Sequence, residues 1–176
     1  MIDKYKYTDK EKDELIKSMV ILVDTREKVN EHIISVFDKN KISHESKALD
    51  RCDYSFYIPA NEKLGIIRDI YFDKEVAIER KASLEEISNN LTKERDRFEK
   101  ELALAPKTKV ILIENACYED ICTGNYNSQF NKKSFLATIH SFWFRYNVPF
   151  FFIKDKSKSA IFIRKYFEYY LKELLR

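Results

Sequence analysis

The stretch Val76-Ala-Ile-Glu-Arg-Lys81 decides how this chain is interpreted, because an apolar run suddenly presents three charged residues in a row. Successive side chains of a β-strand point to opposite faces, so Glu79 and Lys81 should share one face while Arg80 points to the other. Burying charges is costly unless they are paired or bind a metal. The stretch therefore predicts a core strand that carries a polar site at its carboxyl end.

An acid and a lysine on one strand face suit phosphodiester hydrolysis. That reaction needs a divalent cation to hold the phosphate and to lower the pKa of a bound water, and Mg²⁺ prefers carboxylate oxygens. Asp53 begins an extended segment and is placed to supply a second acid, while Asp24, at the end of the apolar run 19–24, is a third candidate. Lys81 would orient or help deprotonate the attacking water, or neutralise charge that develops on the phosphate.

Hydrophobic periodicity and breaker residues divide the rest of the chain into strands and helices. Residues 64–72 and 75–81 are expected to form two strands of a meander, joined by a turn at Asp73-Lys74. The other expected strands or extended segments are 19–24, 42–48, 53–58, 109–114 and 148–153, and the expected helices are 9–17, 31–39, 84–91, 93–105, 133–147 and 159–175. Strands that first meander and then alternate with helices predict an α/β fold with a mixed central sheet flanked by helices. One domain is expected over 19–176, preceded by a short charged extension over 1–18.

Composition excludes several classes of function. The chain has only two glycines, Gly65 and Gly124, so the Gly-rich phosphate loops of nucleotide-binding proteins are absent and no nucleotide cofactor is expected. Three cysteines, without a paired CxxC pattern, argue against a disulfide framework and against structural zinc, and they fit a reducing intracellular compartment.

Charge and hydropathy restrict the kinds of partner that the protein is expected to have. The start of the chain carries charges where a signal peptide needs its apolar stretch, and no run approaches the roughly 18 apolar residues of a membrane span. An intracellular protein without a membrane partner is expected. The net charge is only +3, but residues 154–176 alone contribute +4, so a basic end is available for phosphates.

Three motifs carry a family resemblance. Asp53, twenty-five residues and then Glu79-x-Lys81 look like the PD-(D/E)xK nuclease signature. More narrowly, Val23-Asp-Thr-Arg-Glu27, Cys52-Asp-Tyr54 and Ile78-Glu-Arg-Lys81 resemble the nuclease domain of the XPF/Mus family of structure-specific endonucleases, over residues 20–153. Ser83 and Arg97-Phe98-x-x-Glu101 extend the similarity.

The resemblance implies a restriction-endonuclease-like fold and a metal-dependent endonuclease acting on branched DNA. It implies that Asp24, Asp53 and Glu79 gather Mg²⁺ or Mn²⁺ and that Lys81 assists the water. It further implies that Arg26, Glu27 and Arg80 line the same site. Because Arg80 points away from Glu79, it is expected to pair with an acid such as Glu101 or to bind backbone phosphate.

The chain departs from the family pattern at three points. Cys52 replaces the usual glycine before the motif aspartate, and Glu85 replaces the aspartate expected four residues after the lysine. The helix-hairpin-helix module that commonly follows the nuclease is not present, so DNA would be held by the nuclease domain, by a dimer partner or by another protein. The last two expected helices carry surplus aromatic surface, which favours a homodimer. Its candidate contacts are Trp143, Phe144, Phe162, Tyr166 and Tyr169.

Three functions stay open. Cleavage at flaps, forks or junctions is the main hypothesis, a homodimeric Holliday-junction resolvase is the second, and a catalytically silent subunit that binds DNA or a partner is the third. Taken singly, the motif residues have ordinary structural roles. These are ion pairs for Glu79 with Lys81, Arg26 with Glu27 and Arg97 with Glu101, and a helix or turn cap for Asp24. Their occurrence together, in order and spacing, favours the enzyme.

Overall fold

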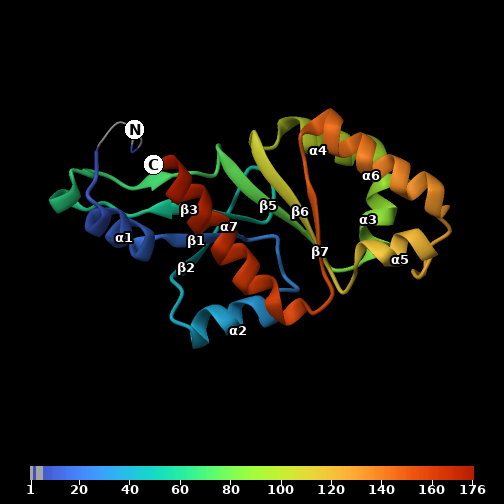
Figure 1. The fold of residues 1–176 in the computed structure, drawn as a ribbon, viewed down its shortest axis with the longest axis horizontal. Coiled ribbons are helices and arrows are strands. Elements are labelled where there is room, and N and C mark those ends of the chain that lie inside the picture. Colours follow the sequence, from blue (N-terminus) through green and yellow to red (C-terminus); the bar gives the residue numbers. More distant parts are fainter. Residues whose placement is uncertain (1, 3–5) are drawn as a thin grey trace.

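A computed structural model describes Ile2 and residues 6–176 of the chain. Its centre is a seven-stranded sheet in the order β2-β1-β3-β5-β6-β7, with β4 beside β3 (Figure 1). β1 pairs in parallel with β2, β6 pairs in parallel with β5 and β7, and β3 is antiparallel to β1, β4 and β5. The strands are β1 (Val20–Asp24), β2 (His44–Lys47), β3 (Tyr54–Ile58), β4 (Ile70–Tyr71), β5 (Val76–Lys81), β6 (Thr108–Glu114) and β7 (Phe150–Ile153). The expected mixed central sheet is confirmed.

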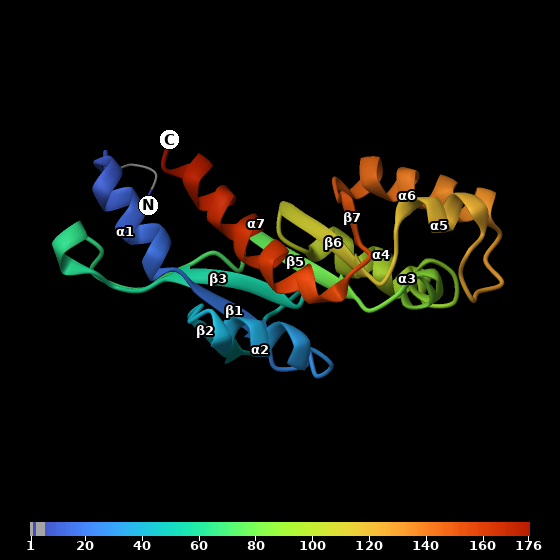
Figure 2. The same ribbon diagram turned by 60° about the horizontal axis from the view of Figure 1, so that its bottom comes forward.

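The helices fall into two groups, at opposite ends of the molecule in both views (Figures 1 and 2). One group comprises α1 (Asp9–Ser18), α2 (Glu31–Lys39) and α7 (Ser159–Leu174). The other comprises α3 (Leu84–Leu91), α4 (Arg95–Leu104), α5 (Tyr118–Thr123) and α6 (Lys132–Tyr146). Short 3₁₀ turns occur at η2 (Glu62–Leu64) and η3 (Lys156–Lys158).

Each helix group covers its own face of the sheet. Alternate residues of β6 point to opposite faces, and Val110 and Leu112 join a first core cluster with α1, α2 and α7. Ile111 and Ile113 join a second core cluster with α3, α4 and α6. Because β6 contributes to both clusters, it is buried on its two faces, as its uninterrupted apolar sequence predicts.

The N-terminal helix packs onto the first core cluster. Thr8 caps α1 with a capping box to Glu11, and Leu15 and Ile16 on its inner side are buried. Of the expected extension 1–18, Met1 and residues 3–5 lie outside the described part of the chain. Within the extension, Asp9–Ser18 thus forms a helix that packs onto the first core cluster.

The expected meander over 64–81 is wrong. β4 has only two residues, and both β4 and β5 pair antiparallel with β3, so the chain runs in the same direction on either side of Asp73-Lys74. The amides of Glu75 and Val76 both donate to the Phe72 carbonyl, which makes a jog rather than a reversal. The apolar side chains of Leu64, Ile66 and Phe72 suggested a strand. They are buried, but most of the segment 64–72 that carries them has an irregular backbone.

Most other elements lie within a few residues of their expected bounds, but α5 was not expected. It has six residues, of which only Ile121 is buried, so it is too short to show helical periodicity. None of the helices in the described part of the chain has both the length and the apolar character needed to cross a bilayer.

Candidate active site

Asp53 and Glu79 meet because β3 and β5 pair at Tyr54 and Ile78, next to both acids. The Asp53 amide donates to the Ile78 carbonyl at 2.9 Å. In return, the Arg80 amide donates to Oδ2 of Asp53 at 2.7 Å. The Asp53 carboxylate is therefore fixed beside Glu79 by two backbone contacts, and it does not depend on a flexible side chain for its position.

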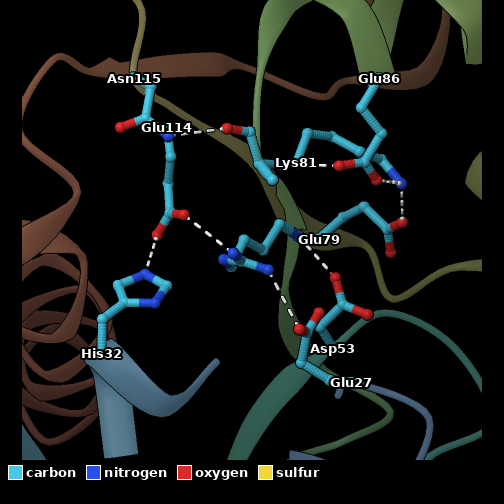
Figure 3. A network of polar contacts seen from close by, with 10 residues as sticks. Glu27, His32, Asp53, Glu79, Lys81, Glu86, Glu114 and Asn115 are labelled. Atoms are coloured by element: carbon cyan, nitrogen blue, oxygen red, sulfur yellow. Dashed lines mark hydrogen bonds and ion pairs between the residues drawn. The ribbon is translucent and has the colours of Figure 1, made fainter. Parts of the chain in front are cut away.

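Lys81 shares the strand face of Glu79, as the alternation predicts. Its Nζ lies 2.7 Å from Oε1 of Glu79 and 3.6 Å from Oε1 of Glu86 (Figure 3). Burial alone would lower the pKa of Lys81, but the charge and hydrogen bond of Glu79 outweigh it and raise this pKa above its ordinary value. Lys81 is therefore a fixed ammonium that can orient water or neutralise charge, and it is not a base at neutral pH.

The acid pair carries negative charge in excess of its partners. Burial raises the pKa of Asp53 well above its usual range, and the neighbouring charge of Glu79 raises it further. Carboxylates are hard oxygen ligands, and a divalent cation between Asp53 and Glu79 would offset the burial and the neighbouring charge that oppose ionisation of Asp53. Asp53 and Glu79 could hold such an ion.

Asp24 is close to this pair along the backbone, since its amide donates to the Asp53 carbonyl at 2.8 Å. Its carboxylate is engaged elsewhere. Oδ1 accepts from the amide and from Nε of Arg26, at 2.7 and 3.0 Å, and Oδ2 accepts from Nη2 of Arg26 and the Leu49 amide, at 2.6 and 3.2 Å. Burial would raise the pKa of Asp24, but the bonds from Arg26 prevail and lower it. The side chain of Asp24 is only 1% exposed.

The expected cluster of Asp24, Asp53 and Glu79 is consequently not preassembled. Within the residues described, no three His, Cys, Asp or Glu side chains are grouped so that they could hold a metal ion. The sequence could place all three acids at neighbouring strand ends, but it could not reveal that Arg26 would take both oxygens of Asp24.

Arg80 joins a buried network with Glu27 and Glu114, both of which are labelled in Figure 3. Arg80 contacts Glu27 through Nη1 at 3.0 Å and Glu114 through Nη2 at 2.9 Å, and Oε1 of Glu114 accepts a hydrogen bond from Nε2 of His32 at 2.8 Å. Burial raises the pKa of Glu27, against the opposing charge of Arg80. The expected pairing of Arg80 with Glu101 is wrong, because Glu101 pairs with Arg97 at 3.5 Å. With its side chain 5% exposed, Arg80 is also closed to backbone phosphate.

A pocket of about 190 Å³ opens above the acid pair. Its lining comes from the segment 50–53, from α4 and the adjoining Ala105, and from Glu79 and Lys81 of β5. Arg26, Arg51 and Arg97 also line it, and Arg97 is anchored to Glu94 at 2.7 Å. Of the expected site residues, Arg26, Asp53, Glu79 and Lys81 thus share this pocket, and Asp24, Glu27 and Arg80 do not line it.

The sequence and the fold now have counterparts among known proteins. Residues 23–166 match the model of the ERCC4 domain. The chain belongs to the ERCC4 domain family. Solved structures similar to it include XPF from Aeropyrum pernix, at 16% sequence identity and a TM-score of 0.61, and XPF from Aeropyrum pernix in complex with DNA, at 18% identity and a TM-score of 0.61. No curated protein sequence matches the chain.

Each structural match covers 88% of this chain and 66% of the solved one, so the chain spans just under two thirds of the length of its structural relatives. At these identities the likeness establishes the fold. The resemblance to XPF-type nuclease domains and the expected fold class are both confirmed.

Two departures of this ERCC4 domain from the family pattern have visible consequences. Cys52 adopts φ +63°, the left-handed conformation that glycine occupies without strain. Glu85 accepts a hydrogen bond from the Asn127 amide at 2.7 Å, outside the pocket. Glu86 instead approaches Lys81, and it also accepts from the Ala82 amide at 2.7 Å at the start of α3. Ser83 caps α3, because its side chain accepts a hydrogen bond from the Glu86 amide.

Glu114 and His32 are the residues that sequence reasoning missed. Glu114 ends a buried strand, which was a usable signal, but nothing in the sequence linked it to Arg80. His32 lacked any cysteine or acid at ligand spacing and received no role, whereas folding brings it to Glu114 from a distant part of the chain.

Proposed function

We propose that this ERCC4 domain is an endonuclease that hydrolyses phosphodiester bonds of branched DNA with the help of Mg²⁺ or Mn²⁺. The observation that carries the proposal is the Asp53–Glu79 pair, crowded beside the ammonium of Lys81 in a pocket rimmed by arginines. The complex of the similar Aeropyrum pernix XPF with DNA supports a nucleic-acid substrate.

A bound divalent ion would polarise the scissile phosphate and lower the pKa of the attacking water. Asp53 and Glu79 would hold it through carboxylate oxygens. Lys81 keeps its proton, so it donates hydrogen bonds to the attacking water or to the phosphate oxygens and offsets their developing charge. Arg51 and Arg97 line the same pocket and would meet the flanking phosphates.

Branched DNA is favoured over smooth duplex because Asp53 and Glu79 line a pocket that a scissile phosphate would have to enter. A regular duplex is stiff, with a persistence length of about 150 base pairs, so it cannot bend a single phosphate sharply into a recess without a cost in free energy. A strand that leaves the duplex at a flap, fork or junction has already lost its partner there. Its backbone can enter between segment 50–53 and α4.

Cleavage of labelled duplex, single-strand, flap, fork and four-way substrates tests the proposal, with Mg²⁺, Mn²⁺ or EDTA. Asp53→Ala should abolish cutting, and Lys81→Ala should lower kcat by about 100-fold to 1000-fold, as when one charge-stabilising donor is removed. Lys172→Ala and Asp155→Ala are matched controls, because both side chains are exposed on elements outside the pocket.

The outcomes separate the remaining functions. Equal cuts on two opposed strands of a four-way junction would identify a Holliday-junction resolvase. DNA binding without cleavage of any substrate would identify a silent subunit and overturn the proposed activity. Equal cutting by Asp53→Ala and the wild type would show that a contaminating nuclease is responsible.

We also propose that the domain acts as a homodimer. Trp143, Phe144 and Tyr169 are exposed on α6 and α7, and Phe162 and Tyr166 continue the aromatic surface of α7. β7 is the edge strand of the sheet and adds Phe151, whose ring centroid lies 5.1 Å from that of Phe162. Such a surface suits a second copy related by two-fold symmetry. A monomer mass for the wild type by light scattering would remove the dimer, and Tyr169→Glu should shift a dimer towards monomer.

We also propose that this protein acts inside the cell. Cys52, Cys117 and Cys122 are all free thiols, which a reducing compartment preserves.

A further inference from the structure

Arg26 pairs with Asp24 and lines the pocket that contains the other two motif acids. Its side chain forms a fork on Asp24, with Nε on one oxygen at 3.0 Å and Nη2 on the other at 2.6 Å. The same Nη2 donates to the Leu49 carbonyl at 2.8 Å. Arg26 also lines the pocket that contains Asp53 and Glu79. Its hydrogen bond to Asp24, followed by the charges of Asp53 and Glu79, raises its pKa, so it lies within electrostatic reach of all three acids.

The pair of Arg26 and Asp24 is asymmetric in a way that makes it separable. The Asp24 side chain is 1% exposed and also accepts a hydrogen bond from the Leu49 amide. The Arg26 side chain is 66% exposed and can turn towards solvent without disturbing the core. Asp24 is therefore a buried acid whose main counter-ion, Arg26, is exposed to solvent and lines the pocket.

A phosphodiester can replace Asp24 as the partner of Arg26. Guanidinium forms the same two parallel hydrogen bonds with phosphate as with carboxylate, so the exchange conserves both the charge pairing and the number of hydrogen bonds. Once released, Asp24 would be left as a buried carboxylate without its counter-ion, which is costly unless a cation replaces the arginine.

We propose that Arg26 is a substrate-released latch. In the free protein it neutralises Asp24, and when a DNA phosphate enters the pocket Arg26 transfers to that phosphate and frees Asp24 to join Asp53 and Glu79 around the divalent ion. This inference rests on the proposed nuclease function. It makes Arg26 a positioning residue that couples phosphate recognition to completion of the metal site, so that a complete site exists only when DNA is bound.

Mn²⁺ binding to the DNA-free protein, measured by calorimetry, tests the latch through a double-mutant cycle. Asp24→Asn alone should leave the Mn²⁺ affinity within about twofold of wild type, because the latched acid does not contribute. Arg26→Ala should tighten Mn²⁺ binding by about tenfold or more, since the apparent affinity is reduced by the fraction of protein that is not competent to bind. Asp24→Asn in the Arg26→Ala background should then remove that gain.

Two further variants keep the test decisive. Arg26→Lys retains the charge but loses the fork, and it should also tighten Mn²⁺ binding. Arg51→Ala removes the same charge from the same pocket without a hydrogen bond to Asp24, and it reports the purely electrostatic part of the effect. Thermal unfolding of each variant checks that it folds, and Arg26→Lys serves if Arg26→Ala does not.

An NMR readout is independent of metal. The guanidinium Nε–H signal of Arg26 should shift when a short DNA flap is added to metal-free protein, as its acceptor changes from carboxylate to phosphate. If Arg26→Ala and Arg51→Ala change Mn²⁺ affinity equally, or if Asp24→Asn weakens binding in the wild-type background, the latch is overturned. The proposed nuclease would still stand in that case, provided that cleavage requires Asp53. Absence of Mn²⁺ binding by every variant would overturn the latch as well.

Discussion

Replacing Glu114 by glutamine should destabilise the protein strongly, because it removes one of two acids from a buried arginine. Glu114 is fully buried and the Arg80 side chain is 5% exposed, with 2.9 Å between Nη2 and Oε2. Breaking a buried ion pair by removing one partner costs about 3–5 kcal/mol. Arg80 retains Glu27 at 3.0 Å, so we expect the lower end, about 3 kcal/mol of unfolding free energy. For a chain of this size that corresponds to a fall in Tm of about 6–12 °C.

Urea denaturation measures this loss, with an unchanged slope as the sign that the denatured state is not altered. Glu173→Gln is the matched control, because its side chain is 68% exposed and its partner Arg176 is also on the surface. It should change the unfolding free energy by less than about 0.5 kcal/mol. A loss of under about 1 kcal/mol for Glu114→Gln would refute the reasoning, since the buried charge would then be solvated in some other way.

The pH dependence gives a second check on the same residue. Burial would raise the pKa of Glu114, but the hydrogen bonds from Arg80 and His32 outweigh it and lower this pKa below its usual value. An acid with a lowered folded-state pKa stabilises the fold above its ordinary pKa and loses that contribution as the pH falls through the lowered value. The gap between wild type and Glu114→Gln should therefore narrow in acid. A gap that widens in acid would contradict the assigned network.

Three further outcomes concern the pocket. Asp53→Asn should raise the unfolding free energy of the metal-free protein at neutral pH. Burial and the charge of Glu79 raise the pKa of Asp53, so ionisation of this carboxyl opposes folding as the pH rises above the ordinary carboxyl pKa. An unchanged stability of the variant would refute this reasoning. Cys52→Gly should be more stable than Cys52→Ala by about 1 kcal/mol in urea, because only glycine relieves the φ of +63°, and equal stabilities would argue against strain. The pH–rate profile of cleavage should show no titration of Lys81 between about pH 6 and about pH 9, because the pKa of Lys81 is raised. Lys81→Ala should be slow over this whole range. A rate that falls with rising pH in the wild type, but not in Lys81→Arg, would contradict this.

The sequence was sufficient to predict side-chain positions wherever a local rule fixes the direction in which a side chain points. Alternation along Val76–Lys81 placed Glu79 with Lys81 and Arg80 on the opposite face, and both placements hold. The buried strands and the longer helices were predictable because their apolar periodicity is long enough to be distinctive. Residues 64–72 failed the same test, since their apolar side chains are buried from a path that is only briefly a strand.

Contacts between distant charged side chains were beyond sequence reasoning. Arg80 had several acids within conceivable reach, and the choice of Glu27 and Glu114 over Glu101 depends on which loops and strand ends meet across the sheet. Asp24 could be predicted at the carboxyl end of its strand, but its capture by Arg26, two residues later, follows from a local turn that no periodicity announces.

The two core clusters differ in how their members are distributed along the chain, and this has a consequence for the order of folding. The second cluster is drawn from one continuous stretch, 84–150, whereas the first requires α7 to return to strands near the N-terminus. Contacts that close short loops form faster than those that close long ones. We expect hydrogen-exchange pulses during refolding to protect amides of β6 and α6 before those of β1. A chain still emerging from the ribosome would then lack the packing that holds Asp24 and Asp53 until residues 159–174 have been added.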